Sequence, residues 1–170
     1  MRRWRESRWV RYGVVAAVGW VGLVLEGVVA LGPLRGLELA PLLLLFFALE
    51  LEFGPGLALT AGLGLAADGL SGLVPGTCIA AWVVWFLILR LAVSRTVDSP
   101  PLFVIVASTA SAAGCLVLQT RVAAWLGGPV IADAASAVLG AAVLGWPVHA
   151  GLVRLDRRFK PRDPMALRPM

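Results

Sequence analysis

The sequence predicts an all-α integral membrane protein, a bundle of six transmembrane helices with both termini in the cytoplasm. Of its 170 residues, 59% are hydrophobic and only 15% are charged, and the mean hydropathy is +0.87. Charged residues make up about 25% of a typical soluble domain. Such a small polar fraction cannot cover the surface of a soluble core. Two further observations support the prediction: apolar segments of spanning length recur along the chain, and basic residues gather at its ends.

Glycines, prolines and charged residues divide the apolar sequence into six expected spans. A transmembrane helix needs about 20 mostly apolar residues, so 170 residues leave no room for a separate soluble catalytic domain. The expected spans cover residues 12–32, 37–53, 55–73, 75–94, 101–126 and 129–153. They form one membrane domain, 1–153, which is followed by a basic cytoplasmic tail, 154–170.

Local signals justify these spans in order. The first is longer than the 7–15 apolar residues of a signal peptide and has no cleavage site, so we expect it to be retained. The second contains the run PLLLLFF at 41–47. The second and third are short, and they form either two full crossings or a hydrophobic hairpin that does not cross completely. The fourth precedes a basic loop. The fifth and sixth each follow proline, which suits the first turn of a helix.

The distribution of basic residues gives the orientation. Thirteen of the 15 lysines and arginines lie at the N-terminus, in the loop after the fourth span or in the C-terminal tail, and only Arg35 and Arg121 fall on the opposite side. Basic loops stay in the cytoplasm, so both termini are expected there. With a net charge of +5, the basic termini are expected to bind anionic lipid headgroups, and we expect no nucleic-acid partner.

Ionisable residues inside the spans are the first candidates for function, because each is costly when unpaired in lipid. Asp68 either caps the break between the third and fourth spans or turns its carboxylate toward the bundle interior or a partner chain. Glu26 either reaches the interface or pairs with Arg35 or Arg121. His149 is the only histidine, and packing or a hydrogen bond to a neighbouring helix is its expected role.

Catalytic and metal-binding patterns are missing from the sequence. It contains no G-x-S-x-G, no HExxH and no Walker loop, and a lone histidine has no evident acid partner. Cys78 and Cys115 lie in apolar segments without metal-ligand spacing. We therefore expect no enzymatic activity, metal or cofactor.

Small residues recur at four-residue spacing, which allows helix backbones to approach closely in lipid. One row in the third span contains Ala58, Gly62 and Ala66, and an adjacent row contains Gly64, Asp68 and Gly72. Such rows serve packing within the chain, unless a row faces lipid and forms a docking surface for another protein.

The stretch at 62–76 is the most motif-like part of the chain. Its candidate partner-binding or structural residues are Gly62, Gly64, Ala66, Asp68, Ser71, Gly72, Pro75 and Gly76. The spacing from Gly64 to Gly76, the six short spans and the basic LDRRF segment at 155–159 resemble the MreD family of rod shape-determining membrane proteins. Glu50 and Glu52 depart from the family pattern, since they make the end of the second span unusually acidic.

This resemblance implies a non-enzymatic scaffold of the bacterial cell-elongation complex in the cytoplasmic (inner) membrane. It implies direct binding to the transmembrane segment of MreC and, through it, association with RodA, the class B penicillin-binding transpeptidase and MreB. Peptidoglycan synthesis and control of cell shape would be the processes supported.

The resemblance also implies a fold similar to the S-components of energy-coupling-factor transporters. A vitamin-type binding subunit of such a transporter is therefore the alternative function. It would need a pocket built from the few polar groups available, which are Glu26, Gln119, Arg121 and Asp133.

Overall fold

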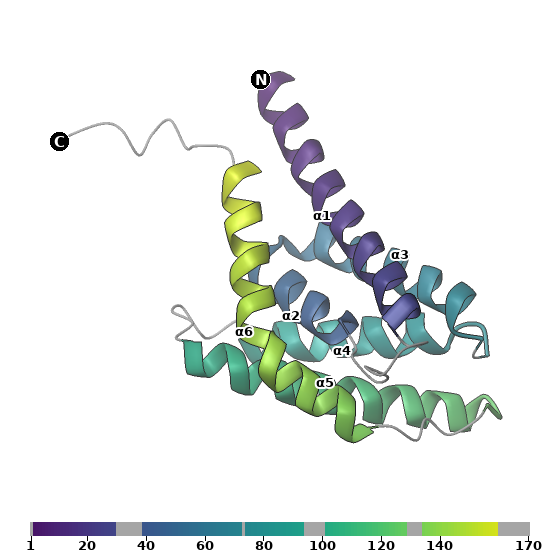
Figure 1. Ribbon diagram of the computed structural model, residues 1–170. Coiled ribbons are helices and arrows are strands. Elements are labelled where there is room, and N and C mark those ends of the chain that lie inside the picture. The colour runs from purple at the N-terminus through teal and green to yellow at the C-terminus, as the bar shows by residue number, and fades with distance from the viewer. Residues whose placement is uncertain (1, 30–38, 73, 94–100, 129–133, 160–170) are drawn as a thin grey trace.

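A computed structural model describes residues 2–29, 39–72, 74–93, 101–128 and 134–159 of the chain. Within these residues the structure contains six α-helices and no strand, which confirms the predicted all-α class (Figure 1). The helices are α1 (Arg2–Val29), α2 (Ala40–Glu50), α3 (Phe53–Ser71), α4 (Thr77–Val93), α5 (Pro101–Trp125) and α6 (Ala134–Phe159).

The observed helices follow the six expected spans, with differences at α1, α2 and α6. Helix α1 begins at Arg2, well before residue 12, because the segment up to Tyr12 contains neither glycine nor proline. Helix α6 continues to Phe159, so the expected start of the tail at residue 154 falls inside a helix. Arg157 and Arg158 in its last turn favour this extension, since cations stabilise the negative end of a helix dipole. Residues 160–170 of the expected tail lie outside the described residues.

Among the described residues, three helices are long and apolar enough to cross a membrane, which indicates a membrane protein. The qualifying segments are Trp9–Glu26, Phe103–Trp125 and Val138–Arg158. Ala40–Glu50 and Thr77–Ala92 are shorter apolar helices. The 11 residues of α2 rise about 16 Å, roughly half the thickness of the hydrocarbon layer. Helix α2 alone is therefore shorter than the hydrocarbon layer is thick, and residues 37 and 38 of the second expected span lie outside the described residues.

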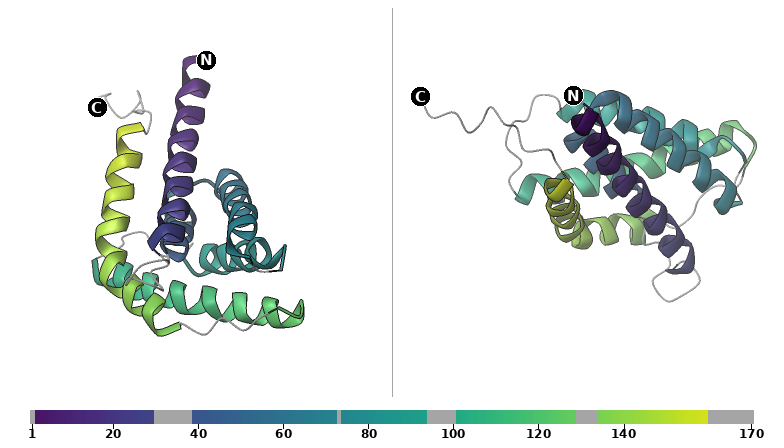
Figure 2. Two further views of the ribbon diagram at one scale, coloured as in Figure 1. Left: turned by 45° about the vertical axis from the view of Figure 1, so that its right-hand side comes forward. Right: turned by 90° about the horizontal axis from the view of Figure 1, so that it is seen from above.

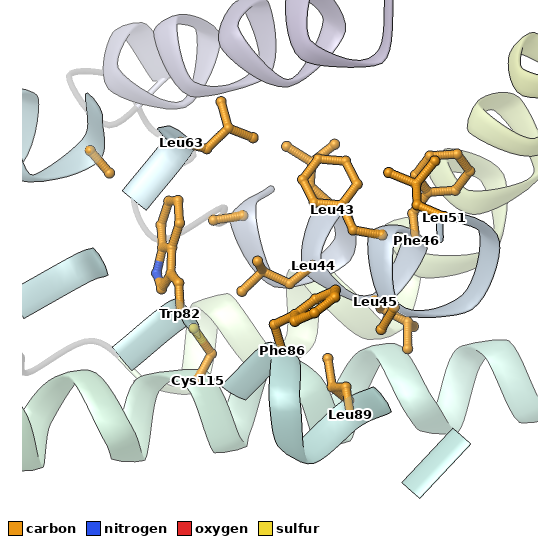
Figure 3. Packing of buried hydrophobic residues seen from close by; sticks show 14 of the residues in the cluster. Leu43, Leu44, Leu45, Phe46, Leu51, Leu63, Trp82, Phe86, Leu89 and Cys115 are labelled. Atoms are coloured by element: carbon orange, nitrogen blue, oxygen red, sulfur yellow. The ribbon is translucent and has the colours of Figure 1, made fainter. Parts of the chain in front are cut away.

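Helix α2 is the centre of the bundle. It contacts all five other helices, and its residues from Ala40 to Ala48 are buried without interruption. A helix that is apolar on every side is stable only when neighbours enclose it completely. Leu44 of α2 points toward Trp82 and Phe86 of α4 and Cys115 of α5, whereas Phe46 lies on another side of α2, where its ring packs against His149 of α6 (Figure 3).

Glycines bring the outer helices together at three points. A Cβ atom at Gly64 would lie 2.7 Å from the backbone Cα of Ile79, so α3 and α4 meet at this glycine. Gly114 of α5 lies against the indole of Trp85, and Gly145 of α6 lies against Ser108. The Ser108 hydroxyl donates a hydrogen bond of 3.2 Å to the carbonyl of Ala141 on α6. Part of the small-residue pattern thus serves internal packing.

Helix α6 bends at Pro147. Proline lacks the N–H that would bond the carbonyl of Val143, and its ring crowds that carbonyl. The first half of α6 runs beside α5, and the second half turns crosswise to α5 and lies on the side of the bundle where α1 begins (Figures 1 and 2).

Candidate functional site

Charged side chains hold both ends of the buried helix α2. At its N-terminal end the carboxylate of Glu26 accepts hydrogen bonds from the backbone N–H groups of Leu39 (3.0 Å) and Ala40 (3.3 Å). The first N–H groups of a helix have no partner within the helix, and Leu39 supplies no side-chain cap. Glu26 therefore serves as an N-terminal cap donated by α1, and it does not pair with Arg121, which is exposed on α5. Arg35 lies outside the described residues.

Two arginines bind the opposite end of α2. The Arg90 guanidinium donates to the carbonyls of Ala48 (2.6 Å) and Leu51 (3.0 Å), and Arg11 donates to the carbonyl of Glu50 (3.2 Å). The last carbonyls of a helix lack intrahelical partners, and cations are favourable at this end of its dipole. Acid at the N-terminal end and base at the C-terminal end thus match the polarity of α2.

Arg11 also forms a buried ion pair with Asp156 of α6. Its Nε and Nη2 atoms donate to the two carboxylate oxygens at 2.5 and 2.8 Å, in a bidentate arrangement. Arg11 is 6% exposed and Asp156 is 2% exposed. One guanidinium consequently joins α1, α2 and α6. We call Arg11, Asp156, Arg90 and Glu26 the α2 clasp.

The α2 clasp was not predicted from the sequence. Arg11 was interpreted only as one of the basic residues that set orientation, and Asp156 only as part of the LDRRF segment. The two positions are 145 residues apart, and no periodic pattern joins them. A lone acid among arginines near the end of a span was the available signal.

Asp68 has the capping role that was one of its two predicted interpretations. Its carboxylate accepts backbone N–H groups from Gly76 (3.1 Å), Cys78 (2.7 Å) and Ile79 (3.2 Å). These N–H groups lie at the start of α4, where the helix dipole favours a negative charge. Asp68 is only 8% exposed, so its oxygens face α4 and do not face lipid.

The two glycines of this turn supply backbone conformations that other residues rarely adopt. Gly72 ends α3 with φ of 64°, and Gly76 precedes α4 with φ of 96°. Ser71 and Pro75 are exposed, and the Ser71 hydroxyl accepts a weak hydrogen bond from Cys78 Sγ at 3.9 Å. The described residues of this stretch, 68–72 and 74–76, therefore connect α3 to α4, and the Asp68 carboxylate holds this connection by hydrogen bonds to the start of α4.

We expect Asp68→Ala to lower the free energy of unfolding by about 0.5–2 kcal/mol, the usual cost of losing a helix cap. Asp68→Asn keeps one acceptor oxygen and should lose less. Thermal unfolding of the purified protein in detergent measures the difference. An Asp68→Ala variant as stable as the starting protein would contradict the capping role.

An apolar groove lies between α1 and α3. Its volume is about 480 Å³, and four of its eight lining residues are alanine or glycine, contributed by both helices. The lining residues are Ala16, Ala17, Trp20, Val21, Ala58, Leu59, Gly62 and Leu63. Gly62 and Ala58 are exposed, whereas Gly64 and Ala66 of the same motif are buried and half-buried. The motif thus divides between a face that packs inside the chain and a face that opens outward.

Gly62 is the one glycine among the residues that line the groove, and it has no close neighbour within the described structure. A Cβ atom added at Gly62 would meet nothing within 4 Å. Each glycine inside a helix costs roughly 0.5–1 kcal/mol relative to alanine. Close approach of a further helix is the arrangement in which such glycines become favourable.

Three buried polar atoms have no hydrogen-bond partner among the described residues: Thr60 Oγ1, Trp82 Nε1 and His149 Nδ1. His149 packs with its ring tilted against Phe46, with the centroids 6.2 Å apart, in agreement with its expected packing role. Within the described part of the chain, no group of three or more His, Cys, Asp or Glu residues could hold a metal ion.

The polar residues that a vitamin pocket would need are not brought together in the groove. Glu26 caps α2, Gln119 is buried on α5, and Arg121 is exposed. None of these three residues lines the groove, and Asp133 lies outside the described residues.

No protein-family model, curated protein or solved structure matches this chain. The α2 clasp, the Asp68 turn and the α1/α3 groove are therefore the features from which a function can be argued.

Proposed function

We propose that the chain is a non-enzymatic membrane scaffold of the bacterial cell-elongation complex. In this proposal it crosses the cytoplasmic membrane six times, with both termini in the cytoplasm and a fold like that of transporter S-components. Its α1/α3 groove receives the transmembrane helix of MreC and thereby supports peptidoglycan synthesis and control of cell shape. RodA, the class B penicillin-binding transpeptidase and MreB associate through MreC.

The single observation that carries the proposal is the open groove with Gly62 among its lining residues. Helices associate in lipid by close packing and interhelical hydrogen bonds, because lipid tails are as apolar as the helices themselves. A groove lined by a glycine whose added Cβ would meet nothing within 4 Å among the described residues suits another helix. The resemblance at Gly64–Gly76 supplies the identity of that partner.

The arrangement of arginines supports the proposed orientation. Arg11 and Arg90 bind the C-terminal end of α2, and Arg11 bonds to the same turns of α6 that carry the exposed Arg154, Arg157 and Arg158. All five therefore gather at one end of the bundle. Basic residues concentrate on the cytoplasmic side of membrane proteins.

The hydrogen bonds that join α1 and α3, the two helices of the groove, to the rest of the bundle support a scaffold function. The α2 clasp fixes α1 to α2 and α6, and the Asp68 turn fixes α3 to α4. Because α1 and α3 are both bonded to other helices of the bundle, a docked helix would meet a preformed surface. A vitamin-binding function has weaker support, since the lining of this groove is apolar.

Copurification with tagged MreC from detergent-solubilised membranes tests the proposal. We expect Gly62→Leu to reduce recovery of MreC at least tenfold, because the leucine side chain would enter the groove from a lining position at which a Cβ atom meets nothing within 4 Å. Ala110→Leu is the matched control, since Ala110 is exposed on α5, a helix that contributes no residue to the groove. Equal recovery with both variants would refute the groove as the docking site.

A further inference from the structure

We infer that the docked helix of MreC lies along the whole exposed face of α3, from Gly54 to Gly69, with its basic cytoplasmic flank beside Glu52. The inference rests on the proposed function and extends its contact surface. On α3 the groove reaches only from Ala58 to Leu63, a rise of about 8 Å, whereas residues 54–69 rise about 22 Å. The groove alone would therefore hold a spanning helix along about a quarter of the hydrocarbon layer.

Exposed residues follow α3 in one line on both sides of the groove. These residues are Gly54, Ala58, Gly62, Leu65 and Gly69. Their spacing of three and four residues places all five within about 80° of one another around the helix axis. Because positions 54 and 69 do not line the groove, the exposed face continues beyond it toward both ends of α3.

The glycines of this face meet no neighbour within the described structure. A Cβ atom at Gly54, Gly62 or Gly69 would find nothing within 4 Å, whereas one at Gly64, on the packed side of α3, would lie 2.7 Å from the Cα of Ile79. Glycine weakens a helix relative to alanine. Three open glycines on one face are favourable when a further helix approaches closely along it.

An acid stands at the end of this face where basic residues otherwise gather. Glu52 directly precedes α3 and is exposed. The neighbouring carbonyl of Leu51 accepts a hydrogen bond from Arg90, and the charge of Arg11 also attracts Glu52. A carboxylate has acceptor sites for more than one donor.

This acid is complementary to the flank of an incoming membrane helix. Lysine and arginine are concentrated where membrane helices leave the bilayer on the cytoplasmic side. In the proposed topology α3 begins on that side, so a helix along its exposed face brings such a flank to Glu52. The charge and the open glycines are independent observations, and both favour the same occupant.

The exposed face of α4 has a different character and provides a control. Val84, Leu87 and Ile88 are exposed there, and they are large apolar residues that suit lipid tails. No residue of α4 lines the groove.

Site-specific photo-crosslinking tests the extent of the contact. Photoreactive residues are placed singly at positions 54, 62 and 69 of the full-length protein, in native membranes that contain tagged MreC, with position 84 as the control. We expect all three positions of α3 to crosslink to MreC with a yield at least fivefold above that of position 84.

The outcomes separate this inference from the proposed function. Crosslinks from position 62 with none from 54 or from 69 would overturn the inference and leave docking in the groove intact. Crosslinks from 54 and 69 to a second copy of this chain would also overturn it. The absence of crosslinks from all three positions would refute the proposed function itself, and the inference with it.

Copurification at two salt concentrations tests the role of Glu52. At about 0.1 M salt we expect Glu52→Gln to reduce recovery of MreC about two- to fivefold, the effect of one exposed ion pair. At about 1 M salt, where screening acts within about 3 Å, the variant and the starting protein should be recovered equally. Arg121→Gln, which removes an exposed charge on α5, is the control and should change recovery at neither concentration.

Thermal unfolding of Glu52→Gln in the same detergent shows whether its fold is as stable as that of the starting protein. Undiminished recovery at 0.1 M salt would overturn the pairing of Glu52 with a basic flank, and so would a loss that persists at 1 M salt.

Discussion

Arg11→Met is expected to lower the free energy of unfolding by about 3–5 kcal/mol, the largest effect of any single substitution considered for this chain. Removing one partner of a buried ion pair leaves the other charge uncompensated, and this penalty dominates the loss. Asp156 would remain 2% exposed without a cation, and the carbonyl of Glu50 would lose a donor. Asp156→Leu should have a similar cost, because Arg11 would then lack its carboxylate. Thermal or denaturant unfolding in mixed micelles measures both.

The double variant distinguishes a true pair from two unrelated residues. When an apolar pair replaces both charges, most of the penalty disappears, so Arg11→Met with Asp156→Leu should be more stable than either single variant. Arg121→Gln, at an exposed site, should change stability by less than about 0.5 kcal/mol. Additive losses in the double variant would show that the two side chains do not act as a pair.

Gly64→Ala is expected to destabilise the protein by about 1–3 kcal/mol, whereas Gly62→Ala, two residues away, should leave its stability unchanged or raise it by up to about 1 kcal/mol. The added methyl group at 64 would lie 2.7 Å from the Cα of Ile79, and a backbone atom cannot move aside without shifting α4. At 62 the methyl group meets open space and improves helix propensity.

The comparison is made by thermal unfolding of the two variants in the same detergent. It separates the two functions that one glycine-rich motif combines, since Gly64 holds α3 against α4 and Gly62 opens into the groove. Equal destabilisation by both substitutions would mean that Gly62 is also a packing residue, and the groove would lose its main support.

The sequence was sufficient to predict the helical class and the approximate position of each helix. Runs of apolar residues separated by glycine and proline locate helices reliably because every backbone group in lipid must be paired within the helix. The bounds of α3, α4 and α5 follow these signals closely. The bend of α6 was not foreseen, although Pro147 is a recognised cause of kinks, because hydropathy records composition and not direction.

Site residues were predictable where the contact is local in sequence. Asp68 lies ten residues before Cys78, and the Gly-Pro turn between them already suggested a cap. The pairing of Arg11 with Asp156 and the capping of α2 by Glu26 were not predictable, since both depend on which helices become neighbours. The sequence also could not show which row of small residues faces outward. Gly62 and Gly64 have the same local sequence signal, and only the position of α4 beside Gly64 distinguishes them.

Site-specific photo-crosslinking in native membranes tests the central claim most directly. A photoreactive residue at Gly62 is expected to crosslink to the transmembrane segment of MreC, whereas one at Ala110, equally exposed on α5, is expected to crosslink to lipid alone. Crosslinks to MreC from Ala110 and none from Gly62 would place the partner on another face and contradict the role of the α1/α3 groove.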